Sequence, residues 1–304
     1  MTFALIGAGA IGNAVRFLLE RAGHSVRAWD ADPARADAGM TPAAAVENAE
    51  AVFLCVPSWA VSDALRSVQP HVSAHAAVVA LTKGVEPESG LFMDAFLQER
   101  LPGRPVALLA GPMLAAELRE GNGGAACVAS PDMAAARRVS AWFDGSGLRA
   151  EPTDDLAGVA AASVLKNVYA LGLGMAAALG WGENKRGWFA GEAVREMARL
   201  LPVFGGRTET ALSPAGAGDL IATGFSPASK NHAVGAEIAR TGTHASPSEG
   251  SAALPALERR VENMAAYPLL QAVADAAARR RTAAEALEDA FTTPVPAGGA
   301  AAVE

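Results

Sequence analysis

The stretch "TFALIGAGAIG" (residues 2–12) decides the architecture of the N-terminal half of the chain. Its first residues are mostly apolar, which is typical of a short strand buried on both faces. Gly7, Gly9 and Gly12 follow with the spacing GxGxxG and lead directly into the helical pattern "AIGNAVRFLLERAG". This order of strand, glycine turn and helix permits a tight turn and lets a ligand approach the N-terminus of the helix closely.

A second apolar run, "SVRAWD" (residues 25–30), ends in Asp30, 18 residues after Gly12. An acid roughly 20 residues after the last glycine accepts the ribose hydroxyls of a bound dinucleotide. A structural turn followed by an unrelated acid is the alternative. Because a carboxylate repels a 2′-phosphate, Asp30 favours NAD over NADP, although Arg27 and Arg35 are near enough in the sequence to weaken that preference.

Short apolar runs recur along the first half with helical patterns between them. They lie at residues 51–56, 77–81, 105–110 and 125–129, and a last one lies within "GLRAEPTDDLAG" (residues 147–158). Strands that alternate with helices predict an α/β fold of the Rossmann type, in which a mostly parallel sheet has helices on both faces.

The composition changes after the last predicted strand, and the alanine- and leucine-rich pattern is then helical almost to the end. We therefore predict a dinucleotide-binding (Rossmann) domain at residues 1–152 and an all-α substrate and catalytic domain at residues 153–290. Residues 291–304 are predicted to form a flexible tail.

The overall composition excludes several classes of partner. The net charge is −7 without a basic run, which argues against nucleic acid and anionic membranes. Both cysteines lie in apolar runs and are interpreted as free thiols, and no metal-ligand spacing occurs, so we predict no metal.

The longest uncharged run, residues 167–182, is too short to insert into a membrane. We expect a cytoplasmic protein, and the small-residue helices suit either a homodimer interface or an internal core.

Ligands of a doubly wound sheet bind at the carboxyl ends of its strands. Three of these ends are "VPSWA" with Pro57, "LTKGVE" with Lys83, and "AGPMLAAE" with Gly111. Lys83 is the cation that a strand end delivers to this edge of the sheet. A solvated loop lysine is the alternative for Lys83.

Lys166 is the single charged residue in "ASVLKNVYALGLGMAAALGWG" (residues 162–182). Burial disfavours the charged form of an ammonium, which suits a lysine that transfers protons. A buried structural ion pair is the alternative, and Asp219 in "SPAGAGDLIATG" is the natural partner. By itself, Asp219 fits a helix cap equally well.

These residues resemble the NAD(P)-dependent glycerol-3-phosphate dehydrogenase family over most of the chain. The matching blocks are "GAGAIG", "VPSWAVSDAL", "LTKGVEPESG", "AGPMLAAEL", "DDLAGVAAASVLKNVYALGLG", "AGAGDLIATG", "SKNHAVG" and "SEG". The "LKN" block followed by "GDL" is much more specific than the glycine fingerprint. The resemblance implies a Rossmann-type domain followed by a helical domain, and a role in glycerol-3-phosphate metabolism and phospholipid biosynthesis.

The resemblance also implies roles for the residues of these blocks. Lys166 is implied as the proton-transferring residue, with Lys83 and Asp219 as its catalytic partners. The small phosphorylated ketone or alcohol substrate is expected to contact Lys83, Gly111, Asn167, Asp219, Thr223, Ser229, Lys230 and Asn231. The cofactor, NAD or alternatively NADP, is expected to contact Gly7, Gly9, Ala10, Ile11, Gly12, Asp30, Pro57, Lys83, Ala115, Lys230 and Glu249.

This chain departs from the family pattern at several positions that concern the substrate. Lys230 stands where the family usually has arginine, and an ammonium binds phosphate less directionally than a guanidinium. Met113 replaces a small hydroxyl residue, and "GAGAIG" is also the form found in ketopantoate reductases. A reductase of another small keto acid or sugar-derived ketone, of the ketopantoate or β-hydroxyacid type, is therefore the alternative enzyme. A dinucleotide-binding sensor without catalysis is the alternative outside enzymes.

Overall fold

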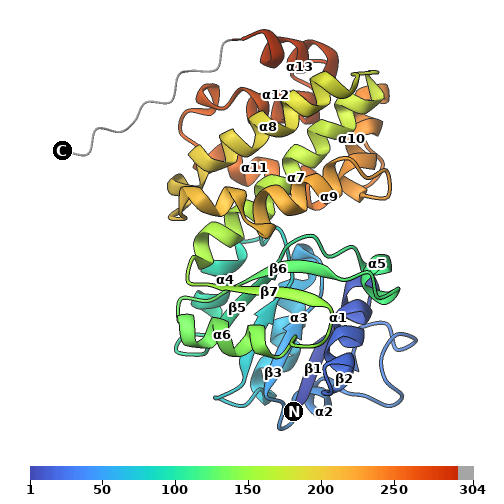
Figure 1. Ribbon diagram of the computed structural model, residues 1–304, viewed down its shortest axis with the longest axis vertical. Helices are drawn as coiled ribbons and strands as arrows, with labels where there is room; N and C mark the ends of the chain where they lie inside the picture. The colour runs from blue at the N-terminus through green and yellow to red at the C-terminus, as the bar shows by residue number, and fades with distance from the viewer. Residues whose placement is uncertain (294–304) are drawn as a thin grey trace, which may run out of the picture. The chain divides into compact units, whose positions relative to one another are not determined.

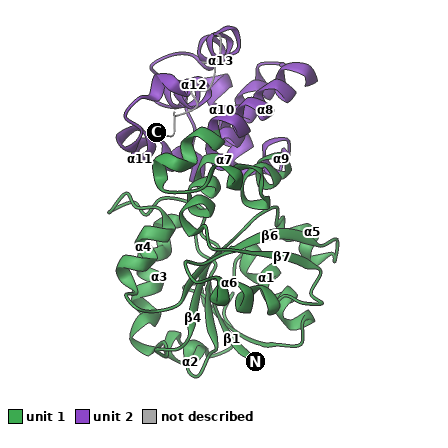
Figure 2. Ribbon diagram, turned by 60° about the vertical axis from the view of Figure 1, so that its left-hand side comes forward, with its two compact units in different colours: residues 1–165, 197–222 green, residues 166–196, 223–304 purple. Residues whose placement is uncertain are grey.

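The computed structural model of the chain describes residues 1–293 (Figure 1). Contacts between Cα atoms divide the chain into two compact units, shown in different colours in Figure 2. Unit 1 comprises Met1–Leu165 and Met197–Ala222, and unit 2 comprises Lys166–Glu196 and the described residues from Thr223 onward. The domain boundary predicted between residues 152 and 153 stays a prediction. It marks the change from strands to helices, whereas the units are divided within a helix.

Unit 1 contains a seven-stranded sheet with the order β2-β1-β3-β4-β5-β6-β7. Its strands are β1 (Thr2–Ile6), β2 (Ser25–Trp29), β3 (Ala51–Leu54), β4 (Ala77–Ala80), β5 (Val106–Ala110), β6 (Gly124–Ala129) and β7 (Leu148–Thr153). The strands β1 to β5 pair in parallel, β6 pairs antiparallel with β5, and β7 pairs in parallel with β6. The predicted α/β fold with a mostly parallel sheet is confirmed.

Both faces of the sheet are covered by helices because the central strands are apolar on both sides. The helices of the first half are α1 (Ala10–Arg21), α2 (Pro42–Val46), α3 (Val61–Val68), α4 (Met93–Arg100), α5 (Ala115–Arg119) and α6 (Met133–Ala141). Helices α1, α5 and α6 share one buried apolar cluster with the sheet. Phe3, Phe53 and Trp142 make ring contacts at its centre. Helices α2, α3 and α4 lie on the opposite face (Figures 1 and 2).

The segment Met197–Ala222 belongs to unit 1 although it follows the first helices of the second half. It contains short helical turns, which are η3 (Leu201–Phe204), η4 (Thr208–Leu212) and the π-helical turn η5 (Pro214–Gly218). A return of this segment to the sheet was not predicted. It brings residues of the second half of the sequence to the strands of the first half.

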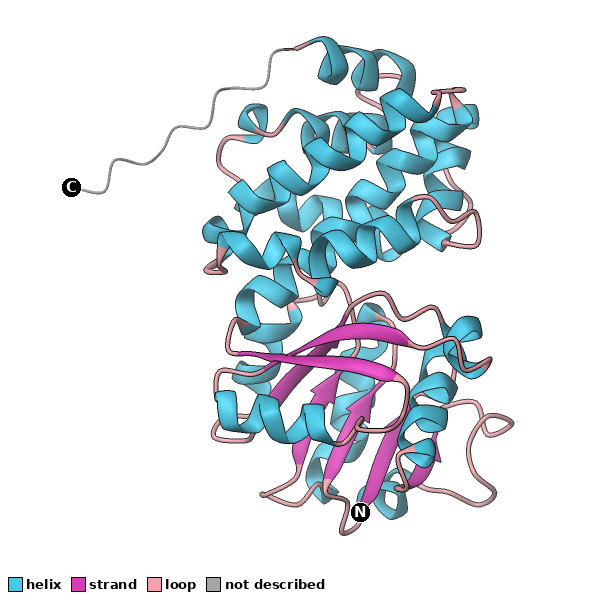
Figure 3. Ribbon diagram, in the orientation of Figure 1, coloured by secondary structure: helices cyan, strands magenta, loops and turns pink. Residues whose placement is uncertain are grey.

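Unit 2 is helical, and the described residues after Thr153 contain no strand (Figure 3). The helices of the second half are α7 (Leu156–Ala178), α8 (Glu183–Leu200), α9 (Asp219–Gly224), α10 (Lys230–Thr241), α11 (Glu249–Arg260), α12 (Pro268–Ala277) and α13 (Ala283–Thr292). Helix α10 crosses α7 so closely that a Cβ on Gly174 would lie 2.0 Å from the carbonyl oxygen of His232. The small residues of α7 therefore serve close helix packing.

Two sequence-based expectations concern the second half directly. Helix α7 is long and apolar enough to cross a membrane, but 94% of its most apolar window is buried inside the protein, as in the core helix of a soluble protein. The predicted tail at residues 291–304 begins two residues inside α13, which extends to Thr292. Residues 294–304 of that tail lie outside the described residues.

Candidate functional site

The glycine turn after β1 has the geometry that its sequence predicts. Gly7 has a φ of +96°, and a Cβ there would lie 2.8 Å from the carbonyl oxygen of Cys55. A Cβ on Gly12 would lie 2.0 Å from the carbonyl oxygen of Gly7, so α1 starts directly against the turn. Nothing lies within 4 Å of the same position on Gly9. The backbone is thus open at the N-terminus of α1, where N–H groups and the helix dipole favour a negatively charged ligand.

Asp30 is fixed beside this turn by two backbone hydrogen bonds. The N–H of Ala8 donates to Oδ2 of Asp30 at 2.7 Å, and the N–H of Asp32 donates to Oδ1 at 2.8 Å. Each carboxylate oxygen can accept a second hydrogen bond. Asp30 therefore braces the turn and can still accept from a ligand, and its role toward ribose hydroxyls stays a prediction.

A cavity of about 360 Å³ opens between the glycine turn, β2 and the segment after β3. Its lining residues are Gly7, Gly9, Trp29, Asp30, Ala31, Arg35, Cys55, Val56, Pro57, Ala60, Asp63 and Ala64. Four residues expected to contact the cofactor are therefore together here: Gly7, Gly9, Asp30 and Pro57. Open backbone, apolar walls and an acid fit the adenosine and pyrophosphate parts of a dinucleotide.

Other residues expected at the cofactor do not line this cavity. Ala10, Ile11 and Gly12 form the first turn of α1, and Ala115 is the first residue of α5. Ile11 and Ala115 pack against the apolar cluster below the sheet edge. Met113 belongs to the same buried cluster, so the structure gives it a packing role.

Lys83 and Asp219 form an ion pair at the carboxyl edge of the sheet. The Nζ atom of Lys83 lies 2.6 Å from Oδ2 of Asp219 and donates to the carbonyl oxygen of Gly111 at 2.9 Å. The side chain of Lys83 is 20% exposed and that of Asp219 is 2% exposed. A largely dehydrated carboxylate thus holds an ammonium that is still partly accessible, in a charge-assisted hydrogen bond.

The pairing of Lys83 with Asp219 was not predicted, because the sequence suggested Lys166 as the partner of Asp219. A weak signal was present in the glycines of "PAGAGD", which permit close backbone packing just before Asp219. A Cβ on Gly218 would contact Pro112 at 3.5 Å. The turn therefore approaches the residue that follows Gly111.

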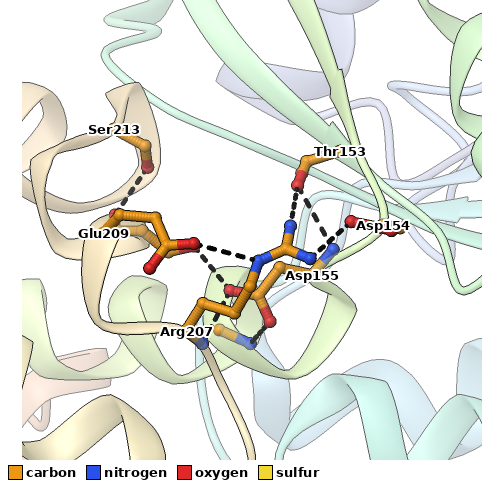
Figure 4. Close-up of polar contacts among 8 residues, drawn as sticks. Thr153, Asp154, Asp155, Arg207, Glu209 and Ser213 are labelled. Atoms are coloured by element: carbon orange, nitrogen blue, oxygen red, sulfur yellow. Dashed lines mark hydrogen bonds and ion pairs between the residues drawn. The ribbon is translucent and has the colours of Figure 1, made fainter.

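Asp155 attaches the Met197–Ala222 segment to the end of β7, as Figure 4 shows. Its Oδ1 accepts from the N–H of Gly158 at 3.0 Å at the start of α7. Its Oδ2 accepts from the hydroxyl of Thr210 at 2.5 Å and from the N–H of Arg207 at 3.0 Å. The guanidinium of Arg207 also pairs with Asp154 at 2.6 Å. These contacts are the reason why a segment far along the chain belongs to unit 1.

Unit 2 brings two asparagines of the expected substrate site together. The Nδ2 of Asn231 donates to Oδ1 of Asn167 at 2.8 Å, and Oδ1 of Asn231 accepts from the N–H of Gly250 at 2.9 Å. Asn167 is in the middle of α7, Asn231 is in the first turn of α10, and Gly250 is in the first turn of α11. The N-termini of α10 and α11 therefore meet α7 at the residue that follows Lys166.

The remaining expected residues lie near these elements. Lys166 is 4% exposed within α7, as expected from its apolar neighbours in the sequence. The Oγ of Ser229 caps α10 by accepting from the N–H of His232 at 3.4 Å, and Lys230 is the first residue of that helix. Glu249 is the first residue of α11, and Thr223 lies in α9. The roles implied for these residues stay predictions.

His232 differs from an ordinary surface histidine. Burial lowers its pKa, and the positive charge of Arg186 lowers it further. The imidazole is therefore neutral over a wider range of pH than usual.

Two larger cavities lie elsewhere in the protein. One of about 600 Å³ lies near the C-terminal ends of α10 and α12, and one of about 500 Å³ lies beside the N-terminus of α6. Neither is lined by a residue predicted for the site.

Comparison with known proteins places the chain in a family. The N-terminal model of NAD-dependent glycerol-3-phosphate dehydrogenase matches residues 35–136, and the C-terminal model matches residues 155–288. A glycerol-3-phosphate dehydrogenase (NAD(P)+) of Azotobacter vinelandii is 34% identical over 95% of this chain and 94% of the relative. One from Mycobacterium bovis is 40% identical over 68% of this chain, and the match spans 60% of that relative.

Solved structures show the same fold. A glycerol-3-phosphate dehydrogenase of Coxiella burnetii has a TM-score of 0.84 at 24% identity and covers 96% of this chain and 99% of its own. A ketopantoate reductase of Ralstonia eutropha has a TM-score of 0.59 at 18% identity, over 96% of this chain and all of its own. The resemblance stated from the sequence is confirmed, and the chain belongs to the NAD(P)-dependent glycerol-3-phosphate dehydrogenase family of oxidoreductases.

Proposed function

We propose that the protein interconverts sn-glycerol 3-phosphate and glycerone phosphate in the cytoplasm, with NAD as its cofactor. The observation that carries this proposal is the ion pair of Lys83 and Asp219 beside the carbonyl of Gly111. It lies at the carboxyl ends of β4 and β5, the edge at which ligands of such sheets bind. Relatives with the name of this enzyme support the choice of substrate.

The glycine turn and the cavity beside it would hold the cofactor. Gly7 and Gly9 would face the pyrophosphate, and Asp30 would accept the ribose hydroxyls of the adenosine. When bound, the nicotinamide supplies or accepts the hydride. The remaining chemistry belongs to side chains of this chain.

The interactions of Arg27 and Arg35, the two arginines near Asp30 in the sequence, support the preference for NAD. The guanidinium of Arg27 donates to the carbonyl oxygens of Ala44 and Glu47 at α2, and Arg35 pairs with Asp32 at 3.3 Å. Arg27 is thus engaged away from the cavity, and the charge of Arg35 is partly balanced. A 2′-phosphate would meet the carboxylate of Asp30, and like charges repel strongly where water is partly excluded, although Arg35 also lines the cavity and would offset part of this repulsion.

In the direction of reduction, the carbonyl carbon of the ketone gains the hydride and its oxygen gains a proton. Lys166 would donate that proton and take it back in the reverse reaction. Lys83 would donate a hydrogen bond to the same oxygen and stabilise the negative charge that develops there. Asp219 would hold the ammonium of Lys83 in place and balance its charge.

The phosphate of the substrate would bind at the N-terminus of α10. Ser229, Lys230 and Asn231 begin this helix, where backbone N–H groups and the helix dipole favour an anion. Asn231 is oriented by Asn167 and Gly250, so its position is set before a ligand arrives. The ammonium of Lys230 would add a positive charge without the fork of a guanidinium.

The test is oxidation of NADH in the presence of glycerone phosphate, ketopantoate or unphosphorylated dihydroxyacetone, with wild type and Lys166→Met compared. Turnover that requires the phosphorylated ketone and is lost in Lys166→Met is the expected result. Turnover with ketopantoate alone would favour the keto-acid reductase, to which the fold is also similar. Binding of NADH without turnover of any ketone would favour the sensor and overturn the proposal.

A further inference from the structure

The turn that precedes Asp219 has an unusual conformation. Residues Pro214–Gly218 form a single π-helical turn, a rare structure that occurs frequently at functional sites. The N–H groups of Gly216 and Gly218 both donate to the carbonyl oxygen of Ser213, at 3.1 Å and 3.3 Å. A Cβ on Gly216 would lie 2.3 Å from the carbonyl oxygen of Ala211. The turn is therefore tightly packed and ends directly at Asp219.

Ser213 connects this turn to the network of Figure 4 that surrounds the buried carboxylate of Asp155. Its hydroxyl donates to the carbonyl oxygen of Thr210 at 2.7 Å and accepts from the N–H of Ala215 at 3.2 Å. The hydroxyl of Thr210 in turn donates to the buried carboxylate of Asp155. Ser213 therefore links the start of the turn to the junction of β7 and α7.

Strand β6 lies on the other side of the turn. Its residue Cys127 is buried, and the strand contacts the turn Pro214–Gly218. Cys127 is opposite Ala110 in the antiparallel pair of β5 and β6, and Gly111 follows Ala110. The same strand pair thus supports two groups that contact Lys83, which are the carbonyl of Gly111 and, through the turn, Asp219.

We propose that Ser213 is a positioning residue that sets Asp219 against Lys83. This inference rests on the proposed function, in which Lys83 stabilises charge on the substrate oxygen. An ion pair of 2.6 Å between a buried carboxylate and a partly buried ammonium depends on accurate placement of both groups. A displacement of 1 Å at a reacting group can cost on the order of 100-fold in rate.

The kinetic test compares matched substitutions of Ser213. Ser213→Ala removes the hydrogen bonds of the hydroxyl with little change in volume, whereas Ser213→Thr retains a hydroxyl. We expect kcat with glycerone phosphate to fall about 10-fold or more in Ser213→Ala, with KM for NADH unchanged and with recovery in Ser213→Thr. Ser140→Ala is the control, because Ser140 in α6 is a buried serine whose hydroxyl has no hydrogen-bond partner among the described residues.

A double-mutant cycle identifies the route of the effect. If Ser213 acts through Asp219, Ser213→Ala costs little further activity in an Asp219→Asn background, since residues that act as a unit are not additive. Equal losses in both backgrounds would overturn the inference. Loss of thermal stability with an unchanged kcat would also overturn it, because that pattern indicates a purely structural role.

A measurement without turnover separates this inference from the proposed function. The rate at which acetic anhydride labels Lys83 can be followed by mass spectrometry of the peptide. An ion-paired ammonium is protected from acylation, so Asp219→Asn and Ser213→Ala should each increase the rate several-fold over wild type. If the wild type reduces no ketone, the proposed function fails, and the labelling still decides the positioning role. Labelling at the wild-type rate in Ser213→Ala would overturn that role.

Discussion

The ammonium of Lys83 lies 2.6 Å from the carboxylate of Asp219, although 136 positions separate the two residues in the sequence. Lys83 follows β4 of the sheet, whereas Asp219 is the first residue of a helix in the second half of the chain. The pair joins the Rossmann-type sheet to the segment Met197–Ala222 within unit 1.

Substitution of Asp219 should affect catalysis more than stability of the sheet. Asp219→Asn retains the shape of the side chain but removes the charge that holds Lys83. We expect kcat/KM for glycerone phosphate to fall on the order of 100-fold or more, which corresponds to about 3 kcal/mol of transition-state stabilisation. Steady-state kinetics and the thermal midpoint of the same samples provide the measurement. A variant with kinetics like the wild type would show that the pair has no catalytic role.

Selectivity for NADH over NADPH should depend on Asp30. Binding of each cofactor can be followed by fluorescence, because Trp29 lines the cavity beside Asp30. We expect wild type to bind NADH at least about 10-fold more tightly, a factor equivalent to about 1.4 kcal/mol. Asp30→Ala should reduce the ratio of NADH affinity to NADPH affinity, because it weakens the binding of NADH and removes the repulsion of the 2′-phosphate of NADPH.

The matched control for the variant Asp30→Ala is Arg27→Gln, which removes a charge from β2, the strand that Asp30 follows. The guanidinium of Arg27 binds carbonyl oxygens of α2 rather than the cavity, so the NADH to NADPH ratio should stay at its wild-type value. A control variant that changes the ratio as much as Asp30→Ala would contradict the assignment of selectivity to Asp30.

Glu86 should stabilise the loop after Lys83 in a pH-dependent manner. Its carboxylate accepts from the hydroxyl of Ser62 at 2.8 Å and from the N–H and hydroxyl of Ser89, both at 2.7 Å. Burial alone would raise the pKa of Glu86, but these hydrogen bonds outweigh burial, and the pKa is lowered from its usual 4.5. Because the folded pKa is lower than the unfolded one, the stabilisation is fully present above about pH 4.5 and is lost as the pH falls through the folded pKa.

Denaturant unfolding of Glu86→Gln at several pH values checks this expectation. At neutral pH the variant should lose about 1–3 kcal/mol, the usual cost of removing a charged acceptor from buried donors. The difference from wild type should become smaller below pH 4.5. A difference that is constant down to pH 3 would show that the charge of Glu86 does not contribute.

Glu196 should be essential for the stability of unit 2. It is fully buried and accepts from the hydroxyl of Tyr169 at 3.0 Å and from the N–H groups of Leu269 and Leu270 at 2.7 Å and 3.0 Å. The carboxylate thereby satisfies the first N–H groups of α12, which are otherwise unpaired at a helix N-terminus. Glu196→Ala should cost about 3–5 kcal/mol in urea unfolding, because buried donors lose their acceptor.

Tyr169→Phe is the graded comparison, since it removes one of the donors to Glu196 and leaves the N–H groups of Leu269 and Leu270. A loss of about 1 kcal/mol is expected, well below that of Glu196→Ala. Equal losses in the two variants would mean that the hydroxyl of Tyr169, and not the N-terminus of α12, accounts for the contribution of Glu196.

Much of the first half could be predicted because its signals are local. "TFALIGAGAIG" predicts a strand, a turn and a helix from residues in direct succession, and β1 and α1 follow that prediction closely. The burial of Lys166 could also be predicted, since its neighbours on the helix are uncharged and mostly apolar or small. The antiparallel direction of β6 and the return of Met197–Ala222 to the sheet depend on contacts between distant segments, which local patterns do not contain.

The sequence by itself determined the class of fold, the glycine turn with Asp30, and the family, because each depends on short blocks of neighbouring residues. Only the tertiary structure decided that Asp219 pairs with Lys83, that Asn231 is held by Asn167, and that Met113 packs in the core. The physical reason is that a carboxylate or amide in a sequence has many potential partners. Its actual partner is set by the elements that bury it, since burial makes an unsatisfied charge or hydrogen bond costly and so selects one geometry.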